Sequence, residues 1–206
     1  MSYFGALKGL ISDTVGRIVR LDSATHAMNV ILYAHHEVHG GSSFTCHYNN
    51  DVTNIGEMTV IAFNTPDTTK WIHLVAEYGS SAASYFALYE TTSIDVDEGT
   101  QLTIYNRDRN SVTASTVTSI ETAPVANKAT SYTEVQAAAA NITTTTELAR
   151  VYLGSGTRKS VGSGSRGADE FVLKQNTQYA AMLVGTTVDD CTHNITLNWY
   201  EHVNKG

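Results

Sequence analysis

The alternation of apolar and polar residues in short runs is the feature that most constrains the fold of this chain. Segment 195–200, ITLNWY, places Ile195, Leu197 and Trp199 at every second position. Successive side chains of a β-strand point to opposite faces, so this period of two predicts a strand with one buried face. Segment 71–78 alternates in the same way.

Turn-forming residues punctuate the chain between these runs. Glycine, asparagine and serine clusters recur about every ten residues, which predicts about eight or nine short strands. That spacing is typical of an all-β protein, either a β-sandwich or a jelly roll, and we assign residues 21–206 to one such domain. Residues 169–202 read as a C-terminal hairpin that closes it. The expected strands include 44–48, 58–63, 71–78, 82–90, 102–105, 148–153, 171–173, 179–184 and 195–200.

Residues 1–20 follow a different pattern from the rest. Their apolar side chains fall at helical spacing and would form a narrow stripe on one face of a helix. These side chains are Phe4, Leu7, Leu10, Ile11, Val15 and Ile18. Gly5, Gly9 and Gly16 weaken such a helix by about 1 kcal/mol each relative to alanine. We therefore expect a helical or extended N-terminal arm that orders when it docks, with packing on its own domain as the alternative.

Charge and cysteine content exclude several classes of protein. Charged residues make up only 16% of the chain and the net charge is −7, which argues against nucleic-acid binding by a basic surface. No apolar run is long enough to cross a membrane. The first residues lack the pattern of a secretory signal, so we expect synthesis in a cytoplasm. Cys46 and Cys191 are then expected to be buried thiols and not a disulfide.

The histidine-rich segment 35–39, HHEVH, is the strongest candidate for a metal site. The H-E-x-x-H helix of zinc proteases is not matched, because the second histidine comes one residue early and Gly40-Gly41 would break the helix. On a strand, His35, Glu37 and His39 would share one face, and a site would need a further ligand. The candidates are His47, His73 and His202. We expect no metal or other cofactor, and polar pairing or subunit contacts instead.

Two further patterns fail as catalytic or nucleotide sites. Loop 154–167, GSGTRKSVGSGSRG, lacks the glycine before the lysine that a phosphate-binding loop needs, and its flanks read as strands. It reads as a mobile loop whose basic residues either contact an acidic neighbour or are simply solvated. No serine sits in a G-x-S-x-G elbow. The sequence therefore predicts a protein that is not an enzyme.

Two stretches resemble a known family. The segment YAHHEVHGGSSF, residues 33–44, and the C-terminal segment ending in WYEH, residues 170–202, are similar to patterns in head decoration (cement) proteins of tailed bacteriophages. The resemblance implies a β-sandwich or jelly-roll homotrimer that clamps capsomers together from outside, without catalysis. The matching residues are His36, Glu37, His39, Gly41, Phe44, Trp199, Tyr200, Glu201 and His202.

This resemblance implies a partner and a location. The partner would be the major capsid protein, bound at symmetry junctions on the exterior of the virion, after synthesis in the cytoplasm of a bacterial host. The expected contacts with capsid or neighbouring subunits are Phe4, Leu7, Ile11, Val15, Ile18, His36 and His39. Two alternatives stay open. One is a glycan- or receptor-binding module using Tyr85, Tyr105 or Tyr132, and the other is a metal-dependent jelly-roll enzyme built on the histidines.

Deletion of residues 1–20 tests the arm. The β domain should stay folded and trimeric, with an unchanged β-type circular dichroism spectrum. Binding to empty heads should fall by about tenfold or more, because three arms on one trimer act together through their effective concentration. Undiminished binding would mean that the arm is not the anchor, and unfolding would mean that the stripe belongs to the domain's own core.

Overall fold

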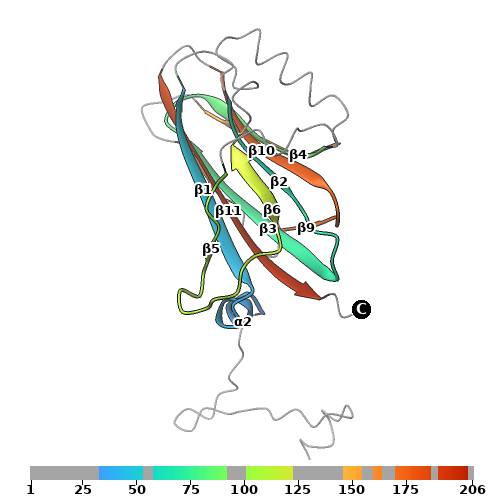
Figure 1. The fold of residues 1–206 in the computed structure, drawn as a ribbon. Helices are drawn as coiled ribbons and strands as arrows, with labels where there is room; N and C mark the ends of the chain where they lie inside the picture. Colours follow the sequence, from blue (N-terminus) through green and yellow to red (C-terminus); the bar gives the residue numbers. More distant parts are fainter. Residues whose placement is uncertain are drawn as a thin grey trace, which may run out of the picture. The chain divides into compact units, whose positions relative to one another are not determined.

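The structure is a computed structural model of the whole chain, and Figure 1 shows its fold. The described residues are 33–52, 58–91, 101–122, 146–154, 160–163, 170–186 and 190–203. The chain divides into two compact units, residues 1–36 and 37–206. The expected boundary between residues 20 and 21 lies outside the described residues. The second unit contains all of the described strands.

Two antiparallel sheets make up this second unit, as an all-β sandwich requires. The first contains, in order across the sheet, β5 (Tyr105–Asn106), β1 (Ser43–Val52), β11 (Cys191–Val203), β3 (Lys70–Ser80) and β8 (Ser160–Ser163), with β9 (Phe171–Leu173) also paired to β3. The second contains β6 (Thr118–Thr122), β2 (Met58–Asn64), β10 (Gln178–Gly185), β4 (Ser84–Thr91) and β7 (Thr146–Leu153). A short helix, α2 (Tyr33–His39), precedes β1.

The strands pair in a nested order. β1 pairs with β11, β2 with β10, β3 with β8 and then β9, and β4 with β7. The first half of the domain is thus matched in reverse order by the second half, as in a long ribbon folded back and rolled up. This connectivity of eight main strands in two sheets is that of a jelly roll. The segment between β4 and β7 adds β5 and β6 at the edges beyond β1 and β2.

The C-terminal segment is not a hairpin, contrary to expectation. β10 belongs to the five-stranded sheet and β11 to the six-stranded sheet, so the two consecutive strands cross the sandwich and do not pair. Both strands carry apolar residues for the same core, which they face from opposite sides. Alternation predicts each strand but cannot tell whether neighbours in sequence pair or cross over.

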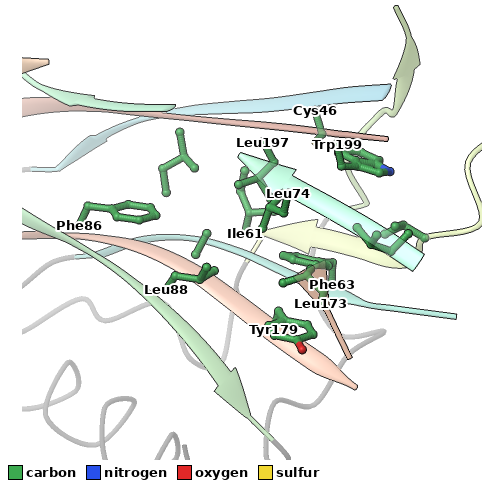
Figure 2. Packing of buried hydrophobic residues seen from close by; sticks show 14 of the residues in the cluster. Cys46, Ile61, Phe63, Leu74, Phe86, Leu88, Leu173, Tyr179, Leu197 and Trp199 are labelled. Carbon is green, nitrogen blue, oxygen red and sulfur yellow. The ribbon is translucent and has the colours of Figure 1, made fainter. Parts of the chain in front are cut away.

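The core lies between the two sheets, where the alternating apolar residues meet (Figure 2). Trp199 on β11 lies opposite Phe44 and Leu74 in the neighbouring strands, and all three are almost completely buried. Side chains from the other sheet, such as Phe63 and Tyr179, face them and stack on each other at 5.6 Å between ring centroids. Each large side chain buried here contributes roughly 1.5–3 kcal/mol of transfer free energy.

Two local expectations are wrong, and the histidine-rich segment, considered above on a strand, forms the helix α2. The strand expected at 102–105 is reduced to Tyr105–Asn106, because most of that segment connects the sheets instead of pairing. The loop expected at 154–167 contains β8, which pairs with Glu77–Ser80 of β3 through its backbone. A glycine- and serine-rich edge strand has few side chains to reveal it. Arg158, Lys159 and Arg166 lie outside the described residues.

Both cysteines are buried thiols that form no disulfide, as the sequence predicted. Cys46 is 0% exposed, and burial raises the pKa of its thiol to about 12. Because the thiolate is the reactive form, neither cysteine should react with iodoacetamide at pH 8 in the folded protein. Both should react within minutes in denaturant, which mass spectrometry would show as two adducts. Rapid alkylation of native protein would contradict this burial.

Candidate functional site

The two stretches that carry the family resemblance meet at one end of the sandwich. Ser43 and Phe44 at the start of β1 pair with Tyr200 and Trp199 near the end of β11. The Glu201 amide then donates to the Ser42 carbonyl at 2.9 Å, which continues the ladder beyond the strand. Residues far apart in the sequence are thus joined by main-chain pairing.

Gly41 makes the turn that links α2 to β1. Its φ of +70° lies in the left-handed region, which glycine adopts without the steric cost of a Cβ. The Gly41 amide donates to the Val38 carbonyl and the Ser42 amide to the Glu37 carbonyl, each at 3.0 Å, which is the pattern of a helix C-cap. The Ser42 hydroxyl also donates to the buried Glu37 carboxylate. A Cβ at Gly41 would collide with the Ser111 hydroxyl, so a second segment packs directly on this turn.

Glu201 anchors that second segment to β11. Its carboxylate is 2% exposed, and it accepts hydrogen bonds from the Ser115 hydroxyl at 2.5 Å and from the Thr116 amide and hydroxyl at 2.9 and 2.6 Å. The Trp199 indole donates to the same carboxylate at 3.2 Å, and the Lys70 ammonium lies 3.9 Å away. A buried charge is tolerable only when it is satisfied in this way.

The segment held by Glu201 and Gly41 begins with a tightly bonded loop, residues 105–113, which we call the apical loop. The Asn106 side-chain amide donates to the Gly41 carbonyl at 2.8 Å and to the Thr113 carbonyl at 3.0 Å, bridging both ends of the loop. The Arg107 amide donates to the Ser43 carbonyl at 2.8 Å. Within the loop, Asp108 accepts from the Asn110 amide at 3.0 Å. The loop is therefore held in one conformation by bonds to β1 and to itself.

The outer surface of the apical loop carries apolar and basic side chains. Val112 is fully exposed, and Tyr105 is 39% exposed. Arg107 and Arg109 are also exposed, and the Arg109 guanidinium lies 5.4 Å from the centre of the Tyr105 ring. The His47 ring stacks on Tyr105 at 6.2 Å. Within the described part of the chain, neither arginine forms an ion pair with a carboxylate.

The residues expected to make contacts are only partly described. His36 and His39 are exposed in α2, and His39 comes two residues before the Gly41 turn. The arm residues lie outside the described residues. They are Phe4, Leu7, Ile11, Val15 and Ile18. In the sequence, residues 106–110 (NRDRN) indicate a charged loop whose asparagine and aspartate are typical of bonded turns, but the pattern does not show which strands the loop contacts.

A second polar cluster covers the outer face of β3 and β11. The Tyr200 hydroxyl donates to the Glu170 carboxylate at 2.8 Å, and the His73 Nδ1 lies 2.7 Å from the same oxygen. The His73 ring stacks on Tyr200 and against His202, both at 4.5 Å. Two of the three histidines considered as additional metal ligands, His73 and His202, thus pack against each other. No set of three or more His, Cys, Asp or Glu side chains in the described ranges could hold a metal ion.

A buried histidine completes the set of polar clusters. His193 is 0% exposed, with its Nδ1 3.0 Å from the Thr59 hydroxyl and its Nε2 3.1 Å from the Ser84 hydroxyl and 3.3 Å from the Cys191 thiol. A serine and a cysteine next to a histidine are the components of a nucleophilic site. All of these side chains are buried, so no substrate reaches them, and the cluster instead ties β2 and β4 to β11. His193 lies on the inward face of β11, and the alternation in the sequence indicates this because His193 comes two residues before Ile195.

The comparisons with known proteins found no relative. A scan against protein-family models gave no match, and searches of curated proteins and of solved structures also gave none. No helix in the described ranges is long and apolar enough to span a membrane. Function is therefore inferred from the geometry and from the two motifs.

Removal of the Glu201 carboxylate should release the apical loop. Glu201→Ala leaves the Ser115 hydroxyl and the amide and hydroxyl of Thr116 without an acceptor, while the Trp199 indole keeps the Ser115 hydroxyl at 3.3 Å, and we expect a loss of about 3 kcal/mol in the free energy of unfolding. Glu201→Gln should lose less, because one side-chain oxygen remains. Urea unfolding at fixed protein concentration would measure both. Glu77→Ala, which removes an exposed carboxylate from the neighbouring strand, is the control and should stay within about 0.5 kcal/mol of the parent.

Proposed function

We propose that this chain is a non-enzymatic structural protein of a bacteriophage virion. As a homotrimer on the capsid exterior it would bind the major capsid protein at symmetry junctions and stabilise the shell. One observation carries the proposal. The residues that resemble the decoration-protein motifs bind the segment that begins with the apical loop: Gly41 accepts from Asn106 in the loop, and Glu201 and Trp199 bond Ser115 just after it.

The loop surface has the composition of a protein contact. Tyrosine and arginine are enriched among the residues that dominate binding energy, and Tyr105 and Arg109 lie against each other here. A loop already held in its bound conformation avoids most of the entropy cost of ordering on binding. Val112 at its surface would gain roughly 1.5–3 kcal/mol if a partner buried it. Three copies on one trimer would then reinforce one another through effective concentration.

The chemistry of the partner follows from charge. The chain carries a net charge of −7, yet its apical loop exposes two guanidinium groups, while the Asp108 carboxylate between them is engaged in the loop's own turn. A capsid surface that combines carboxylates with a small apolar depression would complement this loop. Nucleic acid fits less well, because the rest of the chain repels phosphates and Val112 has no role there.

Glycan binding is a second candidate because of Tyr105. An exposed aromatic ring beside arginine and histidine can stack on a sugar, and Tyr105 has both neighbours. Of the other two tyrosines considered, Tyr85 is covered by the Arg150 guanidinium at 4.6 Å, and Tyr132 lies outside the described residues. A glycan array on the purified trimer distinguishes this function from decoration.

Binding to phage heads that lack the protein tests the proposal. Such heads, from phage with this gene disrupted, should bind the parent chain at saturating, symmetry-defined copy number and become more resistant to heat. Arg109→Glu and Val112→Asp should each weaken this binding about tenfold or more, through charge reversal and through a buried charge. Both side chains are exposed, so the trimer should keep its stability.

Val172→Asp is the matched control. Val172 is also an exposed valine, 51% exposed, but it lies on β9. Its variant should bind heads like the parent. If the parent chain does not bind, decoration is wrong. If the parent and the loop variants bind equally, the contact lies elsewhere on the protein.

A further inference from the structure

β7 is an edge strand of the five-stranded sheet. Among the described strands it pairs on one side only, with β4. Tyr152 is 72% exposed and Val151 is 38% exposed, side by side in the strand. A strand of eight residues at the edge of a sheet can pair with a strand of another chain through its main-chain groups.

A bulge places two opposite charges on the same face of β7. Arg150 pairs with Ala87, and Glu147 pairs with Tyr89. The two partners are two positions apart on β4, whereas the two charged residues are three positions apart on β7. The register shift beside Ala149 accounts for the extra residue. Without it, the two side chains would point to opposite faces. Instead they form an ion pair at 2.5 Å.

This pair is held in place by tyrosines. The Arg150 guanidinium lies over the Tyr85 ring at 4.6 Å and donates to the Tyr89 hydroxyl at 2.8 Å. The Tyr89 hydroxyl donates to the Glu147 carboxylate at 3.0 Å. The hydrogen bond from Arg150 holds the pKa of the Glu147 carboxyl below its usual range, so both groups are charged at neutral pH. Both side chains are still about one third exposed, at 32% and 39%.

From this arrangement we infer that β7 pairs with β7 of a second copy of this chain, antiparallel about a two-fold axis near Ala149, with Glu147 opposite Arg150 of the other copy. In this register each strand contributes one positive and one negative side chain to the same face, in reversed order. Opposite charges directly across an antiparallel pair are favourable, and like charges are unfavourable. In this register Val151 lies opposite Thr146 of the other copy and is covered by the same contact.

The second copy is favoured over an unrelated strand because the strand is complementary to itself. A two-fold axis makes the same patch serve both partners, so one strand must match its own reverse. The charges of β7 meet that condition only in the bulged conformation observed. A strand with two like charges, or with its charges on opposite faces, would not.

This contact goes beyond the proposed trimer. A trimer carries three such edges, and pairing them two by two would join neighbouring trimers into a net. Each contact can be weak in isolation, since many would form together on a particle. Pairing of β7 requires only that two chains meet, so it stands or falls independently of the virion.

Charge exchange between two variants tests the pairing. Glu147→Arg and Arg150→Glu should each weaken self-association about tenfold, because like charges then face each other across the axis. An equimolar mixture of the two should restore it, because every facing pair is again opposite in sign. Sedimentation velocity across about 1–100 µM protein, a range that covers typical weak contacts, would show whether the smallest species present doubles in mass. Glu77→Arg, on the outer face of the other sheet, should leave association unchanged.

Each outcome is decisive. Restored pairing in the mixture supports the contact, since the internal ion pair is broken in both variants and only pairing between chains can recover the complementarity. Parent protein that never doubles at 100 µM, about the upper end of that range, overturns the inference, as do single variants that associate normally or a mixture that stays apart. A doubling from monomer to dimer instead of trimer to hexamer would remove the trimer of the proposed function while leaving this contact in place.

Discussion

Hydrogen bonding to the buried carboxylate of Glu201 is the interaction on which the end of the sandwich around Gly41 depends. The carboxylate lies on the inward face of β11, where a charge is costly, and it is surrounded by donors from Ser115, Thr116 and Trp199. The cost of burial makes the arrangement specific, because the carboxylate is tolerated only when Ser115 and Thr116 are in place. The loop is therefore positioned by the same strand that fills the core with Trp199.

The two motifs gain a physical meaning from this arrangement. In the C-terminal motif, Trp199 and Glu201 face inward, toward the core and toward Ser115. Tyr200 and His202 face outward, and both rings contact His73. In the N-terminal motif, the glycine pair ends α2 and leaves room for the apical loop. Because side chains alternate along a strand, the four residues 199–202 place two side chains in the interior and two on the surface.

Much of the secondary structure was predictable, whereas the topology and the site were not. Periodicity located the strands that carry Ile195 or Leu74, because one buried face imposes a period of two. It could not show that β10 and β11 lie in different sheets, since both face the same core. The apical loop was missed for a related reason. Its conformation depends on Gly41 and Glu201, which are distant in sequence, and local composition records only that Asp108 and its neighbours favour turns.

The nested order of strands also has a consequence for synthesis. Ser43 pairs with Tyr200, so the first strand of the sandwich cannot complete its ladder until the last one leaves the ribosome. At about 5–20 residues per second, β1 waits roughly ten seconds or more for its partner. During that time the edge of β1 that β11 will cover has no permanent partner. A jelly roll of this connectivity folds essentially after translation, which places its greatest risk of misassociation in the nascent chain and not in the finished protein.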